Sequence, residues 1–150
     1  MRLKSNHLQR ARLFLLLPVA VAALAFARAP SPVPYTEWSR AYCVQQSETV
    51  RVVSNAREWT RLWELLGERP PRPLKKNEKA IGIFLGAKPT GGYGVSVDEV
   101  KPAAATIRVD YFFEIPSPRD IVSQSFTSPC TILAVETGAL PLTAHRLATR

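Results

Sequence analysis

Residues 86–93 read Gly-Ala-Lys-Pro-Thr-Gly-Gly-Tyr and separate two segments that have the apolar pattern of β-strands. Adjacent glycines such as Gly91 and Gly92 allow positive φ angles and let another backbone approach closely, as tight connections require. The glycine spacing is not that of a nucleotide-binding loop, and no helix follows to offer its N-terminus to a phosphate. The stretch therefore predicts a hairpin turn between consecutive strands.

Short strand patterns lie on both sides of this turn. Apolar and polar residues alternate with period two after the turn, which is typical of half-buried strands. The segments before the turn and near the end of the chain are shorter and more uniformly apolar. The predicted strands cover residues 48–54, 80–85, 93–98, 106–113 and 131–137.

A single helix is predicted between the first strand and a Pro-rich stretch at residues 70–73. Asn55 and Glu58 have the spacing of a capping box, and Gly67 is a suitable stop. Four apolar residues follow at i, i+3, i+4 and i+7, so they share one helical face and are interpreted as core anchors. They are Trp59, Leu62, Trp63 and Leu66.

The strands that follow the helix are joined by connections too short for crossover helices, which parallel neighbours would need. This favours an antiparallel arrangement. The sequence therefore predicts an α+β fold, in which a small antiparallel β-sheet carries one amphipathic helix packed on one face.

The N-terminal segment resembles an export signal. It begins with basic residues, continues with an apolar run at residues 13–26, and ends on the small-residue pattern of Ala25-Phe26-Ala27. The run is shorter than the roughly 20 residues that span a bilayer as a helix. We expect a signal peptide at 1–27 and an exported protein, periplasmic or secreted. The alternative is an uncleaved N-terminal anchor.

The remaining chain has room for one domain. We expect a Pro-rich linker at 28–37, a single domain at 38–138, and a weakly ordered tail at 139–150. Four of the 20 basic residues lie within residues 1–27, whereas all 12 acidic residues lie after them, so the remainder carries a net charge of +4. That charge is ordinary for a soluble protein and argues against nucleic acid as a partner.

The two cysteines, Cys43 and Cys130, both lie after the signal segment. In an oxidising compartment such a pair forms disulfides readily. The residues alone leave two alternatives open: a Cys43–Cys130 bridge, or two buried thiols that act as small apolar groups.

Catalytic residues are scarce. His145 is the single histidine after residue 27, and it falls in the predicted tail, so a His-based triad or metal site has little to be built from. An enzyme would need Ser125, Ser128 or Cys130 to be activated by a base that the sequence does not offer. We predict a protein that is not an enzyme and that binds no cofactor or metal.

Three separate segments carry a resemblance to a known family. A resemblance to the PrcB C-terminal domain family of bacteria lies in the stretch from Phe84 to Tyr93, then Pro116-Ser117-Pro118, then Gln124 through Thr127-Ser128-Pro129. Its members combine a Gly-x-x-Pro-Thr-Gly-Gly-Tyr turn with a later Thr-x-Pro segment that leads into a closing strand. The resemblance covers roughly Thr49 to Val135. Cys130 departs from it, because the family often has an aromatic residue there.

The resemblance implies a non-catalytic role, because the family's namesake is an accessory subunit of an exported protease complex. It implies an interaction module whose partner is another exported protein, a protease being one candidate, with no membrane contact beyond the anchor considered above. The alternative is a protease inhibitor that presents the Pro89–Tyr93 loop to a protease cleft. The shared residues could equally be required by the fold alone. The candidate partner-binding residues are Pro89, Thr90, Gly91, Gly92, Tyr93, Thr127, Ser128 and Pro129.

Overall fold

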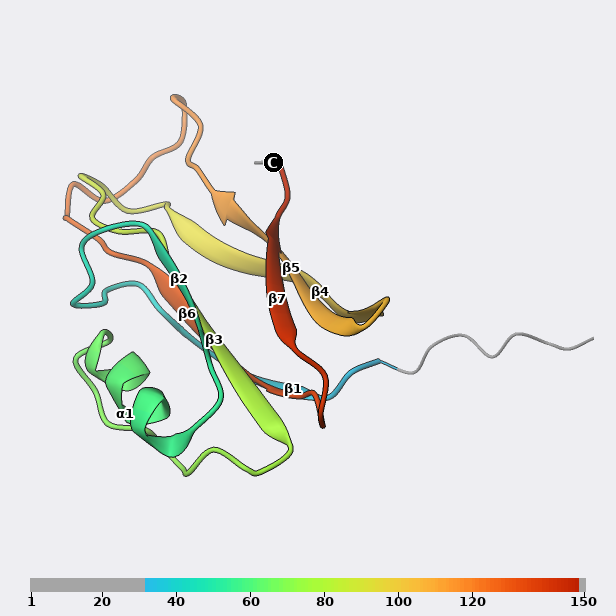
Figure 1. Cartoon of the computed structure of the whole chain (residues 1–150). Helices are drawn as coiled ribbons and strands as arrows, with labels where there is room; N and C mark the ends of the chain where they lie inside the picture. The colour runs from blue at the N-terminus through green and yellow to red at the C-terminus, as the bar shows by residue number, and fades with distance from the viewer. Residues whose placement is uncertain (1–31, 149–150) are drawn as a thin grey trace, which may run out of the picture.

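The computed structural model of the chain describes residues 32–148. The predicted signal peptide at 1–27, the first part of the predicted linker and the last two residues lie outside the described residues. Residues 32–148 form two β-sheets and one helix, with the helix beside the first sheet (Figure 1). No helix in this part of the chain has the length and apolar character needed to cross a membrane.

The first sheet has the strand order β1-β6-β3-β2, and all neighbouring strands are antiparallel. Its two central strands, β3 and β6, are buried along almost their whole length, which explains their uniformly apolar sequences. The edge strands are more exposed. The strands are β1 (Tyr35–Arg40), β2 (Thr49–Val53), β3 (Glu78–Phe84) and β6 (Cys130–Glu136).

The helix α1 (Ala56–Glu64) follows β2 and confirms the predicted cap. The Asn55 side chain accepts a hydrogen bond of 3.0 Å from the backbone N–H of Glu58. In return, the Glu58 carboxylate accepts one of 3.2 Å from the backbone N–H of Ser54, so the start of the helix is satisfied on both sides. Gly67 has a φ of +82°, the conformation that glycine adopts most easily where a helix ends.

The two helical tryptophans are core residues, as the apolar face predicted. Trp59 and Trp63 lie 5.5 Å apart, and Trp38 of β1 completes the cluster at 5.9 and 5.5 Å from them, measured between ring centroids. The indole N–H of Trp59 donates a hydrogen bond of 2.9 Å to the carbonyl oxygen of Arg72. This bond ties the loop after the helix to the cluster.

The second sheet has the order β4-β5-β7 and packs on the other face of the first. β4 and β5 are antiparallel, as expected, but β5 and β7 are parallel. Within residues 32–148, the chain passes from β5 to β7 through β6 of the first sheet, so this parallel pair needs no crossover helix. The strands are β4 (Gly94–Ala103), β5 (Thr106–Glu114) and β7 (Leu142–Arg146).

The two faces of the first sheet bury two separate apolar cores. Side chains that alternate along a strand point to opposite faces. Ile81 and Ile83 of β3 therefore join the core between the sheets, while Ala80 and Phe84 join the core beneath α1.

Of the two alternatives for the cysteines, the structure shows the disulfide: Cys43 and Cys130 are bonded, with their Cα atoms 6.2 Å apart, and they are 87 positions apart in sequence. Both are fully buried in the core beneath α1. The bridge joins the loop before β2 to the first residue of β6.

Three expectations need correction. The fold is broadly α+β but mainly β, and it has two sheets instead of one. The predicted linker at 28–37 is wrong for residues 35–37, which begin β1 because they pair with β6. The predicted weakly ordered tail at 139–150 is wrong for residues 142–146, which form β7 because the exposed side of β5 accepts them as a further strand.

Candidate functional site

The Gly-rich segment at residues 86–93 lies between β3 and β4, but it is not a hairpin turn. β3 belongs to the first sheet and β4 to the second, and the two strands do not pair. The segment therefore carries the chain from one sheet to the other. The prediction of a hairpin is wrong because sequence proximity of two strands does not fix their pairing.

This segment pairs instead with residues 123–127, which precede β6. Lys88 and Thr127 exchange two backbone hydrogen bonds, of 2.7 and 3.0 Å. The Thr127 hydroxyl donates a third, of 2.8 Å, to the carbonyl oxygen of Thr90, and Gly91 N–H donates to the carbonyl oxygen of Ser123 at 2.9 Å. The structure thus brings together the two elements that the sequence singled out.

The predicted site residues differ in their exposure. Pro89 and Gly92 are exposed, whereas Thr90, Tyr93 and Thr127 are half-buried. The remaining three, which a partner could not reach in this conformation, are Gly91, Ser128 and Pro129.

Ser128 has a structural role. Its hydroxyl donates a hydrogen bond of 2.7 Å to the carbonyl oxygen of Gln45, and its backbone bonds to Ala41 and Cys43. These contacts fix the loop before β2 beside the disulfide. Of the three nucleophiles considered from the sequence, Ser128 is buried, Cys130 is in the disulfide, and Ser125 is exposed.

Two glycines of the segment lie close to residues 116–123. A Cβ atom on Gly91 would lie 2.4 Å from the Ser123 hydroxyl oxygen. Gly92 has a φ of +83°, and a Cβ there would lie 2.7 Å from a methyl carbon of Val122 and 2.9 Å from the Pro116 ring. The Ser123 hydroxyl can rotate away from a Cβ on Gly91, so it is Gly92 whose φ and surroundings require glycine where the segment lies against residues 116–123.

Sequence reasoning missed two apolar side chains at this end of the molecule. Ile121 is fully exposed and Phe126 is 79% exposed. Both lie on the long loop between β5 and β6, next to the residues that hold the Gly-rich segment. Single apolar residues within a polar loop were the available signal. We call the exposed residues Pro89, Gly92, Ile121 and Phe126 the loop-end surface.

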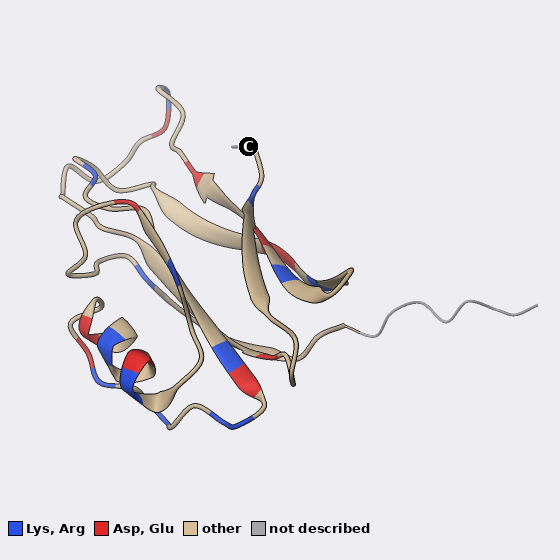
Figure 2. Cartoon of the chain, in the orientation of Figure 1, with Lys and Arg blue, Asp and Glu red and all other residues tan. Residues whose placement is uncertain are grey.

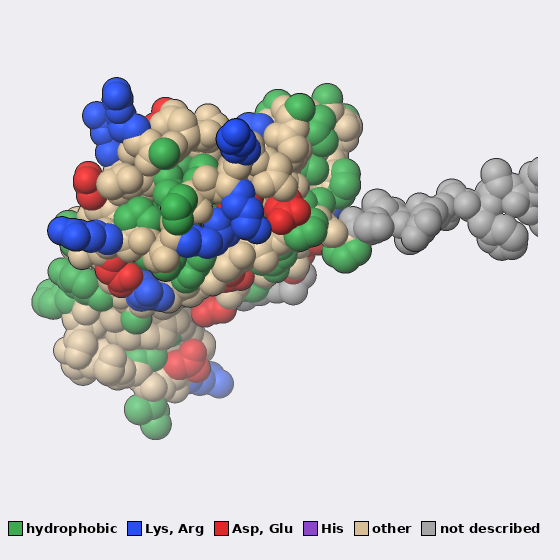
Figure 3. Space-filling model, turned by 90° about the horizontal axis from the view of Figure 1, so that it is seen from below, with side chains coloured by type: hydrophobic (Ala, Val, Ile, Leu, Met, Phe, Trp, Pro, Cys, Tyr) green, Lys and Arg blue, Asp and Glu red, His purple; other side chains and the backbone are tan. Residues whose placement is uncertain are grey.

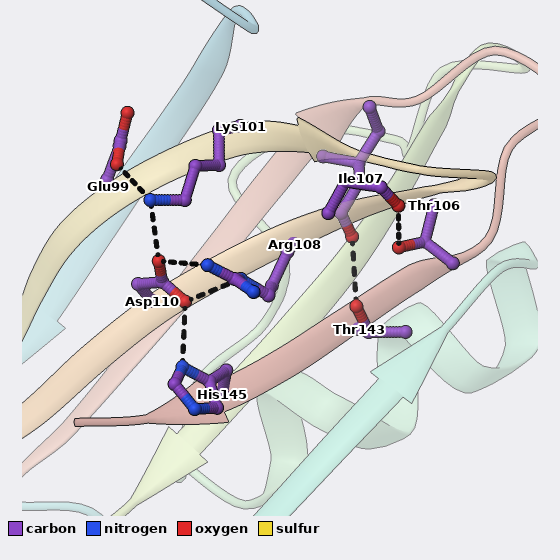
Figure 4. A network of polar contacts seen from close by, with 9 residues as sticks. Glu99, Lys101, Thr106, Ile107, Arg108, Asp110, Thr143 and His145 are labelled. Atoms are coloured by element: carbon purple, nitrogen blue, oxygen red, sulfur yellow. Dashed lines mark hydrogen bonds and ion pairs between the residues drawn. The ribbon is translucent and has the colours of Figure 1, made fainter.

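Away from the Gly-rich segment, a cluster of polar side chains lies on the second sheet (Figure 4). The Asp110 carboxylate is almost fully buried and has three nitrogen-bearing neighbours from three strands: the cations Lys101 and Arg108, and the His145 ring. Lys101 Nζ lies 3.0 Å away, the Arg108 guanidinium 2.8 Å and His145 Nδ1 3.1 Å. Burial acts to raise the pKa of Asp110, but hydrogen bonds from these neighbours outweigh it and hold the pKa below its usual value.

The cluster corrects the placement of His145, which was expected in a weakly ordered tail. Within residues 32–148, Asp110 is its one hydrogen-bond or ion-pair partner. A triad would also need a hydroxyl or thiol bonded to the other ring nitrogen. In the same range, no group of three or more His, Cys, Asp and Glu side chains has an arrangement that could hold a metal ion.

Comparison with known proteins gives one match. Residues 79–136 match the family model described as PrcB C-terminal, which confirms the resemblance over this range, whereas residues 49–78 of the predicted range lie outside the match. The matched range runs from β3 to the last residue of β6, so it includes the Gly-rich segment and residues 127–129 but not α1. No curated protein and no solved structure matches the chain.

Proposed function

Because residues 79–136 match the PrcB C-terminal family, we propose that the protein is an exported, non-catalytic interaction module that binds and supports another exported protein. The observation that carries the proposal is the loop-end surface. There, the two segments typical of the family are bonded to each other, and beside them two large apolar side chains face solvent. Isolated exposed apolar residues are common, but a group on one end of a domain favours a protein contact.

The Gly-rich part of the loop-end surface is fixed by contacts within the domain. Four backbone hydrogen bonds and the Thr127 hydroxyl hold the Gly-rich segment, and Gly92 packs closely against Val122 and Pro116. A surface ordered in advance loses less conformational entropy on binding, so it binds more tightly for the same contacts.

The partner that this proposal favours is a secreted protease or another envelope protein. The family's namesake is associated with an exported protease, and that association is the reason to place a protease first among the candidates. The buried Cys43–Cys130 disulfide supports export, since such bonds persist in oxidising compartments.

The protease inhibitor is the weaker alternative. An inhibitory loop needs an accessible tip that can enter a cleft. Here, the Thr90 carbonyl and the Gly91 N–H are engaged with Thr127 and Ser123, and Gly91 is buried. Pro89 and Gly92 alone are exposed within the predicted Pro89–Tyr93 loop. This arrangement favours a broad contact surface over an inserting loop.

The test is crosslinking of the oxidised chain in its native host, followed by mass spectrometry. We expect crosslinks from the loop-end surface to one exported protein, and at least a tenfold loss of that product in the double variant Ile121→Ser, Phe126→Ser. Leu140→Ser is the matched control, because Leu140 is exposed but lies in the turn before β7. Equal loss in the control, or crosslinks that persist in the double variant, would contradict the proposal.

Assays against a panel of proteases distinguish the protease inhibitor from the supporting module. Stoichiometric inhibition of a cysteine or serine protease, abolished by a change at Pro89, would favour the inhibitor. Binding of a protease without inhibition would favour the supporting module.

A further inference from the structure

β2 is an edge strand with one free side. It pairs with β3 on one side, and it is the last strand in the order of the first sheet. Within residues 32–148, no further backbone hydrogen bond reaches residues 49–53. Near the start of the strand, Glu48 pairs with Arg146 of β7 at 3.0 Å. The unpaired N–H and C=O groups of such an edge can accept another extended chain.

One face of this edge is apolar and incompletely covered. Val50 and Val52 lie opposite Ile83 and Ile81 of β3, so they point toward the second sheet. The two isoleucines are fully buried, whereas Val50 is 39% and Val52 is 44% exposed. The core between the sheets therefore ends at β2 with apolar side chains in contact with solvent. A further strand with apolar residues beside Val50 and Val52 would extend this core.

The opposite face of the same edge is basic. Arg51 points to the side of α1, and together with Arg61 and Glu58 it lines a pocket of about 370 Å³ between β2 and the helix. Within the described residues, neither arginine has an ion pair or a side-chain hydrogen bond. The Glu58 carboxylate is engaged with the backbone N–H of Ser54. The pocket is therefore lined by two arginines and one carboxylate, which gives it a net positive charge.

The sequence around this pocket also has a net positive charge. Residues 51–79 contain eight basic and four acidic residues, although the protein after residue 27 carries a net charge of only +4. Figure 2 shows basic residues on β2, on α1, on the loop that follows it and at the start of β3. In Figure 3, Lys and Arg side chains are spread over the face that is seen from below, with apolar side chains between them.

We propose that the free edge of β2 binds an extended segment of a partner protein in which apolar residues alternate with acidic ones. The period of a strand requires this pattern, because successive side chains point to opposite faces. The apolar residues contact Val50 and Val52, and the acidic residues lie beside Arg51 and Arg61. Main-chain hydrogen bonds to β2 provide affinity, and the two faces provide specificity.

Charge favours this partner over a second copy of the chain. If β2 paired with β2 of another copy, both Arg51 side chains would lie on the same face of the joined sheet. Like charges across neighbouring strands are destabilising, and with two arginines and one carboxylate the pocket in each copy has a net positive charge. The site uses none of the residues of the loop-end surface, so it does not rest on the proposed function.

The test uses fluorescein-labelled peptides and the oxidised full chain. The peptide Thr-Val-Glu-Val-Glu-Val-Thr has the proposed pattern, and the same peptide with Lys in place of Glu has the opposite charge. By fluorescence anisotropy at low salt, we expect the Glu peptide to bind at least about fivefold more tightly than the Lys peptide. Arg51→Glu should remove or invert that preference.

Arg69→Glu is the matched control, because it makes the same change of charge at an exposed residue of the loop after α1, outside the pocket. It should leave the preference unchanged. Hydrogen exchange provides a second readout, because strand addition should protect amides in residues 49–53, whereas a side-chain contact alone would not. Equal binding of the two peptides, no new protection in β2, or dimerisation that protects β2 without peptide would each overturn the proposal.

Discussion

Nδ1 of His145 on β7 lies 3.1 Å from Oδ1 of Asp110 on β5, which joins the last strand of the chain to the middle strand of the second sheet. The same carboxylate lies between Lys101 of β4 and Arg108 of β5. One buried acidic group therefore links all three strands of this sheet. Glu99 extends the cluster outward through an ion pair with Lys101.

Removal of this carboxylate should destabilise the protein at neutral pH. In Asp110→Asn, Lys101, Arg108 and His145 lose their common carboxylate partner, but these side chains are partly exposed and can be hydrated. We therefore expect a loss of about 1–3 kcal/mol in the free energy of unfolding. Urea denaturation at pH 7 measures it, with the exposed Glu64→Gln as the control.

The stability that the Asp110 carboxylate contributes should depend on pH in a defined direction. The pKa of Asp110 is lower in the folded protein than its usual value, so its contribution to stability is present above pH of about 4 and is lost as the pH falls. The difference between wild type and Asp110→Asn should accordingly shrink at pH 3. A difference that stays constant from pH 7 to pH 3 would show that the ionised carboxylate is not the cause.

The Cys43–Cys130 bridge should contribute substantially to stability. It closes a long loop, and in the chain-entropy description such a bridge stabilises by about 4.6 kcal/mol. The double variant Cys43→Ala, Cys130→Ala should therefore melt about 10 °C or more below the oxidised wild type in a calorimetric scan. Because both cysteines are buried, a reducing agent should act slowly on the folded protein and quickly in denaturant. Rapid reduction without denaturant would contradict this placement.

Gly86 should be far less tolerant of alanine than Gly138. Both have positive φ angles, of +78° and +56°. A Cβ on Gly86 would lie 2.8 Å from the carbonyl oxygen of Gln46 and 2.9 Å from the backbone nitrogen of Glu48. A Cβ on Gly138 would meet no atom within 4 Å apart from those of its chain neighbours. We expect Gly138→Ala to cost about 1 kcal/mol and Gly86→Ala more than about 2 kcal/mol, by urea denaturation. Equal costs would mean that backbone conformation alone decides the effect.

Locally encoded elements could be predicted from the sequence. The cap formed by Asn55 and Glu58 and the apolar face with Trp59 and Trp63 depend on residues within two turns of each other. The central strands of the first sheet are likewise marked by uninterrupted apolar residues. β1 and β7 lack such a pattern, and each exists because a distant strand accepts it as a partner.

The candidate site shows the same division. The Gly-rich segment could be identified from its sequence, but its pairing with Thr127 joins residues about 40 positions apart and has no local signal. Asp110 and His145 are separated by 35 positions in the chain. The loop-end surface depends on which apolar residues remain uncovered, and that is decided only once the two sheets are packed.

Arg72 should be essential mainly because Glu78 is buried. The Glu78 side chain is 2% exposed, and the Arg72 guanidinium donates two hydrogen bonds to it, of 2.7 and 2.8 Å. Burial acts to raise the pKa of Glu78, but bonds from Arg72 and from the backbone N–H of Lys75 hold it below its usual value. In Arg72→Met, a buried carboxylate would lose its main partner, so we expect a loss of about 2–4 kcal/mol at pH 7.

The second substitution, Glu78→Gln, tests this cause. In the background of Arg72→Met it removes the unpaired charge, so it should restore part of the lost stability, although the same change alone should destabilise the wild type. A double-mutant cycle by urea denaturation measures this coupling. Arg72 also lies over the Trp38 ring at 5.6 Å, and its carbonyl accepts from Trp59. If Glu78→Gln gave no recovery, the loss in Arg72→Met would come from that aromatic packing and not from the ion pair.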